Sequence, residues 1–385
     1  MKRYNFNKII CRKDTNSVKY DLGKGDDCLS MWIADMDFPV ADEIVKALKK
    51  RVNHPIYGYS YIPDDVFDAF INWQKTRNGI AIKKADIIPY YSVVAGINLL
   101  LNIFTEPNDN ITIMSPVYNY FWTGIKNAKR NIVASPLINS DGYYLIDFAN
   151  LDLCLQKSKV LLLCSPHNPV GRVWSEGELK KIAALAEKNH VLVISDEIHS
   201  DLIMPGFKHV PFSTVNERIK DSTFTLLSAT KTFNIAATGM SFLVSENPEH
   251  IKQINEAMCQ YHLGAQNVFA PVMVNAAFQH GAAWLDQVIK YIEGNYQLVK
   301  TEIEAKMPKI SLPPLEGTYL LWLDCRKLKK CVCDFFETEA KVLGEDGSLF
   351  GENGAKFYRI NIATPRKNIR KMLARLEEEY RLCEK

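Results

Sequence analysis

The sequence predicts an α/β protein with a mostly parallel sheet flanked by helices, together with a smaller α+β domain. In the middle of the chain, short and continuously apolar runs alternate with helical patterns, which is typical of strands buried on both faces. Towards the C-terminus, long helical patterns over about 249–305 precede two isolated strands, at 318–323 and 357–362, and a helix that starts at Lys367. This change of pattern indicates a second, smaller domain.

The individual elements follow from apolar spacing and turn residues. Helices are predicted at 42–52 and 64–77, and the aromatic stretch HPIYGYSYIP between them reads as a loop. The run SVVAGINLLLNIF, residues 92–104, predicts a largely buried helix. Strands are predicted at 110–114, 160–164, 191–195, 223–227 and 239–244, with an amphipathic helix at 176–189.

Length and composition limit the classes of protein. A chain of 385 residues exceeds one ordinary domain, and we expect residues 50–280 to form the large domain and residues 1–49 together with 281–385 the small one. The formal charge of +3 gives no reason to expect nucleic acid or membrane as a partner. The start, MKRYNFNKII, does not resemble a secretory signal, and the nine cysteines are scattered. We therefore expect a reduced, cytoplasmic protein without a metal site.

Polar side chains follow several of the predicted strands. Lys231 lies in SATKTFN directly after the strand at 223–227, and Asp196 follows the apolar VLVIS. The other polar residues at strand ends are Tyr118, His167, Asn168, His199 and Ser228. Ligands of open α/β sheets bind beyond the carboxyl ends of the strands, so these side chains are expected to converge. A lysine, a carboxylate and phosphate donors are the groups that pyridoxal phosphate requires.

Each residue also has an ordinary structural explanation. Lys231 alone could be a solvated surface charge, and Asp196 could cap a nearby backbone group. Asn168 fits a turn in SPHNPVG, and Tyr118 could be ordinary packing. The helix start at SVVAG offers free N–H groups to a phosphate, but every helix has such an end. The combination of these residues, and none of them singly, favours a cofactor site.

Motifs along nearly the whole chain resemble the pyridoxal-phosphate enzymes of fold type I. The shared motifs are SPHNPVGRVW, ISDEIHSDL, SATKTFN and YRINIATP. More narrowly, the chain is similar to the cystathionine β-lyase (MalY/PatB) subgroup of C–S lyases. That subgroup resemblance adds ADMDF at 34–38, the HPIYGY loop, GAAWLDQVIKYIEGN at 281–295 and EGTYLLWLDC at 316–325. It implies the PLP-dependent transferase fold of type I, with a large domain and a smaller α+β domain.

The resemblance also implies roles for matching positions around the cofactor ring. Lys231 matches the lysine that bonds to the cofactor, and Asp196 the acid that faces the pyridine nitrogen. Asn168 matches the amide at the phenolic oxygen, and Tyr118 the tyrosine that stacks on the ring. His199 lies where this subgroup has a histidine and many aminotransferases have a tyrosine.

Further matches concern the phosphate, the substrate and a partner subunit. Val93, Val94 and Ser228 match phosphate-binding positions. Tyr59 matches a tyrosine that reaches the phosphate from the neighbouring subunit, which implies a homodimer. Arg359 matches the arginine that holds the substrate α-carboxylate, and an arginine in an apolar strand does need a planar anionic partner. An internal salt bridge is the alternative for Arg359.

The activity implied is β-elimination from L-cysteine S-conjugates, cystathionine and/or cysteine, to a thiol, pyruvate and ammonia. One alternative is an aminotransferase of the class I/II type, which uses the same lysine. Another is a regulatory cofactor-binding protein with secondary lyase activity. Departures from the family pattern at Tyr90-Tyr91, NIAATGMS and SPVYNYFW touch the pocket wall, so they bear on substrate identity rather than on cofactor use.

Overall fold

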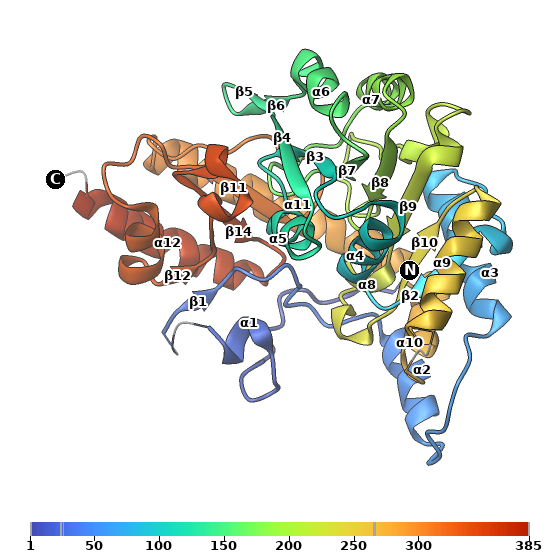
Figure 1. Ribbon diagram of the computed structural model, residues 1–385. Helices are drawn as coiled ribbons and strands as arrows, with labels where there is room; N and C mark the ends of the chain where they lie inside the picture. Colours follow the sequence, from blue (N-terminus) through green and yellow to red (C-terminus); the bar gives the residue numbers. More distant parts are fainter. Residues whose placement is uncertain (1, 24, 26, 265–266, 384–385) are drawn as a thin grey trace.

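A seven-stranded sheet forms the centre of the larger part of the molecule (Figure 1). The computed structural model describes residues 2–23, 25, 27–264 and 267–383. The strand order is β2-β10-β9-β8-β7-β3-β4, and only β10 runs antiparallel to its neighbours. The strands are β2 (Ile87–Tyr90), β3 (Asn110–Ser115), β4 (Asn131–Pro136), β7 (Val160–Cys164), β8 (Leu192–Asp196), β9 (Thr223–Leu227) and β10 (Ser241–Val244). The predicted mostly parallel sheet is confirmed.

Helices cover both faces of this sheet, which explains the continuously apolar strand sequences. In β7, Leu161 and Leu163 pack in a core with α6 (Phe148–Leu155) and α7 (Glu176–Lys188). Leu162 points to the opposite face and packs in a second core. That second core is completed by α4 (Val93–Phe104), α5 (Asn119–Asn127) and α9 (Pro248–Gln260). Alternate residues of one strand are therefore buried on opposite sides.

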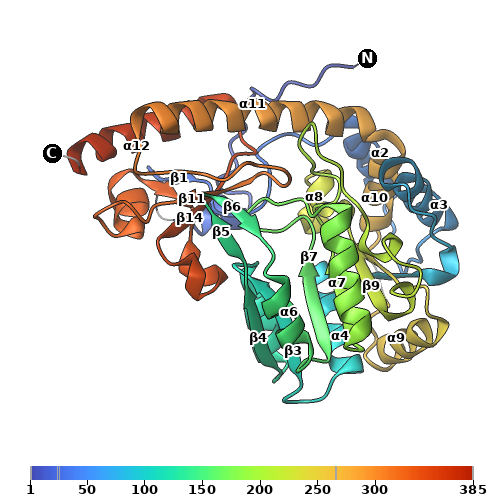
Figure 2. The same ribbon diagram turned by 90° about the horizontal axis from the view of Figure 1, so that it is seen from above.

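A smaller antiparallel sheet lies beside the central one, in the order β11-β14-β13. Its strands are β11 (Leu320–Asp324), β13 (Glu345–Asp346) and β14 (Phe357–Asn361). The long helix α11 (Ala282–Lys306) runs along one side of the whole molecule (Figure 2). At one end it packs against α10 (Ala270–His280), which in turn packs against α2 (Asp42–Val52) and α3 (Asp64–Trp73), and at the other end it packs against α12 (Arg366–Cys383).

Short elements complete the fold. They are α1 (Val18–Asp21), β1 (Leu29–Ser30), the hairpin β5 (Ile138–Ser140) and β6 (Tyr143–Leu145), α8 (Ala229–Thr232) and β12 (Val342–Leu343). Because β1 pairs in parallel with β12, the N-terminal segment joins the C-terminal part of the chain. The predicted helix at 64–77 ends as α3 at Trp73 and continues as a π-helical turn, Gln74–Asn78.

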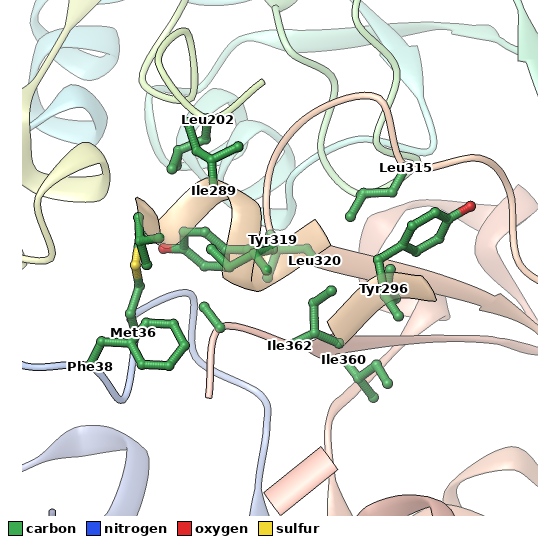
Figure 3. Close-up of a cluster of buried hydrophobic side chains, with 14 of the residues drawn as sticks. Met36, Phe38, Leu202, Ile289, Tyr296, Leu315, Tyr319, Leu320, Ile360 and Ile362 are labelled. Atoms are coloured by element: carbon green, nitrogen blue, oxygen red, sulfur yellow. The ribbon is translucent and has the colours of Figure 1, made fainter. Parts of the chain in front are cut away.

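A buried apolar cluster joins the two parts of the molecule (Figure 3). Figure 3 shows Tyr319 and Leu320 of the smaller part between Met36 of the N-terminal segment and Ile362. The same cluster continues through α11 to Phe70 of α3. Because this core is continuous, the predicted division into residues 50–280 and residues 1–49 with 281–385 stays a prediction.

Two classes of feature are missing from the described residues. None of their helices combines the length and the apolar character that crossing a bilayer requires. They also contain no group of three or more histidine, cysteine, aspartate or glutamate side chains that could share a metal ion.

Candidate active site

A cavity of about 190 Å³ lies beyond the carboxyl ends of β7, β8 and β9. Seven of the eleven residues singled out from the sequence line it: Lys231, Asp196, Asn168, Tyr118, His199, Val93 and Val94. His167 does not line it, because its ring is fully buried and its Nε2 hydrogen-bonds with the Pro116 carbonyl, at 2.8 Å. The remaining lining residues are Ala34, Tyr91, Ser92, Cys164, Ile198, Thr230, Ala236, Gly239 and Ser241. The fold thus gathers at one place residues that are far apart in the sequence.

Lys231 lies in α8, a single helical turn that begins directly after β9. The Ser228 hydroxyl starts this turn by accepting a hydrogen bond from the Thr230 N–H, at 3.2 Å. The Lys231 Nζ donates a hydrogen bond to the Ala34 carbonyl, at 2.6 Å. Burial lowers the pKa of Lys231 to about 8, although Asp35 opposes this shift. Much of the amine is therefore uncharged at mildly alkaline pH, which makes it a competent nucleophile and base.

Asp196 is the last residue of β8 and is 3% exposed. Its Oδ1 accepts a hydrogen bond from the Ile198 N–H, at 3.1 Å. Burial raises the pKa of Asp196 to about 7, and the attraction of Lys231 only partly offsets this. A cation in direct contact with such a buried carboxyl group would stabilise its ionised form and lower its pKa.

His199 is an uncharged ring on the cavity wall. Burial lowers its pKa to about 3. Its buried Nδ1 has no hydrogen-bond partner within the described part of the chain. The unpaired Nδ1 of His199 and the Asp196 carboxyl, which lacks a close cation, are both compatible with a flat, protonated heteroaromatic ring in the cavity. Pyridoxal phosphate provides such a ring.

Tyr118 and Asn168 come from neighbouring strand ends. The backbone N–H of Tyr118 donates to the Asn168 carbonyl, at 3.0 Å, which links the two loops. Asn168 Oδ1 accepts a hydrogen bond from the Arg359 Nη1, at 3.1 Å. Since its amide oxygen is used in this way, Asn168 retains its NH₂ group as a donor. Burial raises the pKa of Tyr118, so its hydroxyl stays protonated.

One wall of the cavity is suited to an anion. Ser92 caps α4 by accepting the Ala95 N–H at 3.2 Å, and Val93 and Val94 form the first turn of this helix. First-turn N–H groups have no partner inside their helix, and the helix dipole adds positive potential there. Ser228, predicted to bind the phosphate, does not line the cavity, and its hydroxyl hydrogen-bonds with Thr230 Oγ1, at 2.8 Å. Thr230 itself lines the cavity.

Arg359 lies in the middle of β14, is 2% exposed and forms an ion pair with Glu345. Its Nη2 also donates to the Trp32 carbonyl, at 3.1 Å. The internal ion pair considered as the alternative from the sequence is therefore present. Arg359 touches the cavity through Asn168.

The sequence did not single out Ala34, Tyr319 or Glu345, although the first two lie within the quoted motifs ADMDF and EGTYLLWLDC. The Tyr319 hydroxyl donates to the Ala34 carbonyl, at 2.8 Å, so this one oxygen accepts from both Tyr319 and Lys231. Asn361 holds the same loop through the carbonyls of Ile33 and Asp35, at 2.7 and 2.6 Å. At Ala34 the functional group is the backbone carbonyl, so the side chain gives no indication of its role in the sequence.

Tyr59 does not take part in this cavity. Its side chain is fully exposed, in the loop between α2 and α3. A tyrosine expected to act from a neighbouring subunit would be exposed in a single chain, so its role stays a prediction.

The sequence matches a family model described as aminotransferase class I and II over residues 26–376. It is 35% identical to the cystathionine beta-lyase PatB of Bacillus subtilis (strain 168), over 97% of this chain and 100% of that protein.

Two solved structures share the fold over almost the whole chain. A PLP-bound putative aminotransferase from Clostridium difficile 630 superposes with a TM-score of 0.96, at 35% identity, over 98% of this chain and 100% of that one. Cystalysin from Treponema denticola, which contains a pyridoxal 5'-phosphate cofactor, superposes with a TM-score of 0.95, at 35% identity, over 99% of each chain.

Proposed function

The chain belongs to the aminotransferase class I and II family as a pyridoxal-phosphate-dependent carbon–sulfur lyase of the cystathionine β-lyase type, and we propose that it cleaves L-cysteine S-conjugates. The proposed substrates are cystathionine, cysteine or both, and the products are a thiol, pyruvate and ammonia. The single observation that carries the lyase proposal is the 35% identity to the cystathionine beta-lyase PatB over 97% of this chain. The half-buried Lys231 amine, with its pKa lowered to about 8 in a cavity that also contains Asp196, supports the cofactor chemistry that a lyase shares with an aminotransferase.

The residues that would hold the cofactor are those of the cavity wall. Lys231 is the proposed attachment point, and Asp196 would hold the proton of the ring nitrogen. Tyr118 and His199 would lie against the ring, and Asn168 would donate its NH₂ to the phenolic oxygen. The amides of Val93 and Val94 would bind the phosphate, and Ser228 would support them through Thr230.

Bound pyridoxal phosphate supplies an aldehyde that condenses with amines and a ring that withdraws electrons from Cα. The protein residues provide the remaining steps. Arg359 would bind the α-carboxylate and so orient the Cα–H bond towards Lys231. The uncharged Nζ of Lys231 would then take the Cα proton as a general base. The thiolate leaves from Cβ without full prior protonation.

The cavity lining of one chain carries little positive charge. Among the described lining residues, the only basic side chains are Lys231 and His199, and His199 is uncharged. Arg359 is already paired with Glu345. Among the residues that line the cavity in one chain, the described ones include no arginine for a distal carboxylate; in the proposed homodimer, such a group would come from the second copy.

The test is product formation by the purified protein with L-cystathionine and with L-cysteine, without an added keto acid. The proposal predicts pyruvate and ammonia in equal amounts, and the two rates rank the substrates. An aminotransferase, the activity suggested by the name of the Clostridium difficile relative, would form product only when a keto acid is supplied. Absence of pyruvate with both substrates, with a spectrum that still responds to them, would move the assignment to transamination.

We also propose that the active unit is a homodimer in which Tyr59 completes the neighbouring site. An apolar hollow of about 790 Å³ shares Ala236 with the cavity and is lined in part by Phe38, Val52 and Phe269. Ile56, Tyr59 and Tyr61 are exposed on the adjacent loop. Exposed apolar surface of this kind favours burial by a second copy.

Mixing two inactive variants tests the shared site. Tyr59→Ala and Lys231→Ala each impair every site of their own homodimer, whereas a mixed dimer contains one site with both native residues. Activity that reappears on mixing supports the proposal. Sedimentation as a monomer, or no recovery in a mixture shown to exchange subunits, would contradict it.

A further inference from the structure

We propose that Glu345 is an internal counter-ion that competes with the substrate carboxylate for Arg359 and thereby sets the affinity of the enzyme for amino acids. The inference rests on the proposed role of Arg359 in substrate binding. It adds a specificity-determining residue, Glu345, to that role.

The backbone places the two side chains together. Strands β13 and β14 pair antiparallel with Glu345 directly opposite Arg359. Opposite residues of such a pair project from the same face of the sheet. The pairing of Glu345 with Arg359 is therefore a property of the strand register and not of a freely moving surface side chain.

Close packing holds Glu345 at this position. The preceding Gly344 donates its N–H to the Tyr358 hydroxyl, at 2.8 Å, and a Cβ at Gly344 would lie 2.4 Å from the Tyr358 ring. After β13, a Cβ at Gly347 would lie 2.2 Å from the Gly354 carbonyl oxygen. Since both flanks of β13 are fixed, Glu345 can leave Arg359 only by a change of its own side-chain torsions.

The charges around Arg359 leave Glu345 as its counter-ion. Among the described residues, the other contacts of the guanidinium are neutral: Asn168 Oδ1, the Trp32 carbonyl and the Phe350 ring, 4.9 Å from Cζ. The Glu345 side chain is 15% exposed, so its attraction to Arg359 is weakly screened by water. The charge of Glu345 also acts on Lys231, where it opposes the lowering of the amine pKa by burial.

A substrate carboxylate that reaches Arg359 must share the guanidinium with Glu345 or displace it. Two carboxylates on one guanidinium repel each other, and this repulsion weakens binding of the second one. Loss of the Glu345 charge should therefore tighten binding of a ligand that carries an α-carboxylate. It should leave a ligand without that carboxylate unaffected.

The experiment compares 2-aminoisobutyrate with its amide, 2-aminoisobutyramide, on the holoenzyme. 2-Aminoisobutyrate lacks both a Cα proton and a leaving group, so its dissociation constant can be read from the visible absorbance of the cofactor without turnover. The Glu345→Gln variant should bind the acid about tenfold more tightly than the native protein and the amide equally well. The control Glu352→Gln, at an exposed position on a neighbouring turn, should change neither constant.

The role of Glu345 and the role of Arg359 can be contradicted separately. If Arg359→Ala loses affinity for the acid while Glu345→Gln leaves it unchanged, the role of Glu345 is wrong and that of Arg359 stands. If Arg359→Ala binds the acid as the native protein does, the proposed role of Arg359 is itself wrong. Should Glu345→Gln fail to fold, Glu345→Asp is the second variant, because its carboxylate is one methylene group further from Arg359. It should bind 2-aminoisobutyrate more tightly than the native protein, by a smaller factor, and the amide equally well. Equal affinities of Glu345→Asp and the native protein for 2-aminoisobutyrate would contradict the inference.

Discussion

The two sides of the cavity compensate their charged groups in different ways. On the side of the central sheet, Asp196 has a raised pKa, Lys231 has a lowered pKa, and the His199 Nδ1 has no partner within the described residues. On the side of the smaller sheet, Arg359 is equally buried and its charge is compensated by Glu345, although its Nε has no hydrogen-bond partner within the described residues.

The difference separates two kinds of binding. Buried polar groups that lack partners in the chain alone fit a resident cofactor that supplies those partners permanently. A buried arginine that already has a counter-ion fits a ligand that enters and leaves, because the charge stays compensated between turnovers.

The largest effect is expected from Lys231→Ala on the sheet side. Turnover and the visible absorption band of the protein-bound cofactor should both disappear, because the attachment point and the proposed base are lost together. The far-ultraviolet circular dichroism spectrum should be unchanged. Pyruvate release and an absorbance scan measure the two losses.

The control for this substitution is Lys252→Ala, at an exposed position on α9. It should retain both activity and absorbance. A Lys231→Ala protein with a native absorption band would place the cofactor elsewhere.

The Asp196→Ala substitution should preserve the absorption band but lower kcat by roughly a thousandfold, because the ring nitrogen would no longer hold its proton. Its effect on the dissociation constant of 2-aminoisobutyrate should be much smaller. Steady-state kinetics and a spectral titration separate the two quantities. A rate within about threefold of the native protein would show that Asp196 has only a structural role.

The sheet side could be predicted from the sequence because its residues follow recognisable strands. β7, β8 and β9 are continuously apolar, and parallel strands bring their carboxyl ends to one edge. The edge strands β2 and β4 were not predicted. β2 is only four residues long and contains Pro89, and the exposed and half-exposed residues of β4 blur its apolar pattern.

The smaller-sheet side was harder to predict. The partner of Arg359 depends on the register of β13 against β14, and β13 has only two residues, both acidic. Such a strand has no apolar alternation from which a register could be read. The Ala34 carbonyl was missed because backbone acceptors are identical in every residue.

The pH dependence of stability should also distinguish the two sides. The pKa of Asp196 is raised from 3.8 to about 7, so the folded apoprotein holds a proton there that the unfolded chain has lost. The stability contributed by this group is full at acid pH and falls as the pH rises through about 7. Compared with Asp196→Asn, the native apoprotein should lose a few kcal/mol between about pH 4 and 7.

Denaturant unfolding of both apoproteins across this range measures the difference. Added pyridoxal phosphate should abolish it, because the ring nitrogen then gives Asp196 a cationic partner. Parallel stability curves for the two apoproteins would contradict the unpaired state of Asp196.

The smallest effect is expected from Tyr319→Phe, at the boundary between the two sides. The ring remains packed, but the hydrogen bond to the Ala34 carbonyl is lost. An increase of about 1 kcal/mol in the activation free energy is expected, which corresponds to a severalfold lower kcat. The pH profile of kcat should shift, since Lys231 uses the same carbonyl. Tyr296→Phe, in the same apolar cluster on α11, is the matched control and should leave the profile unchanged (Figure 3).

The most direct test of the account is to locate the cofactor by chemistry. Reduction of the holoenzyme with borohydride fixes pyridoxal phosphate to the amine that carries it, and trypsin then fails to cleave at that lysine. The account predicts a modified peptide that spans residues 221–252 with the label on Lys231. A label on any other lysine, or no label on a protein that retains the cofactor, would contradict the assignment of the cavity as the active site.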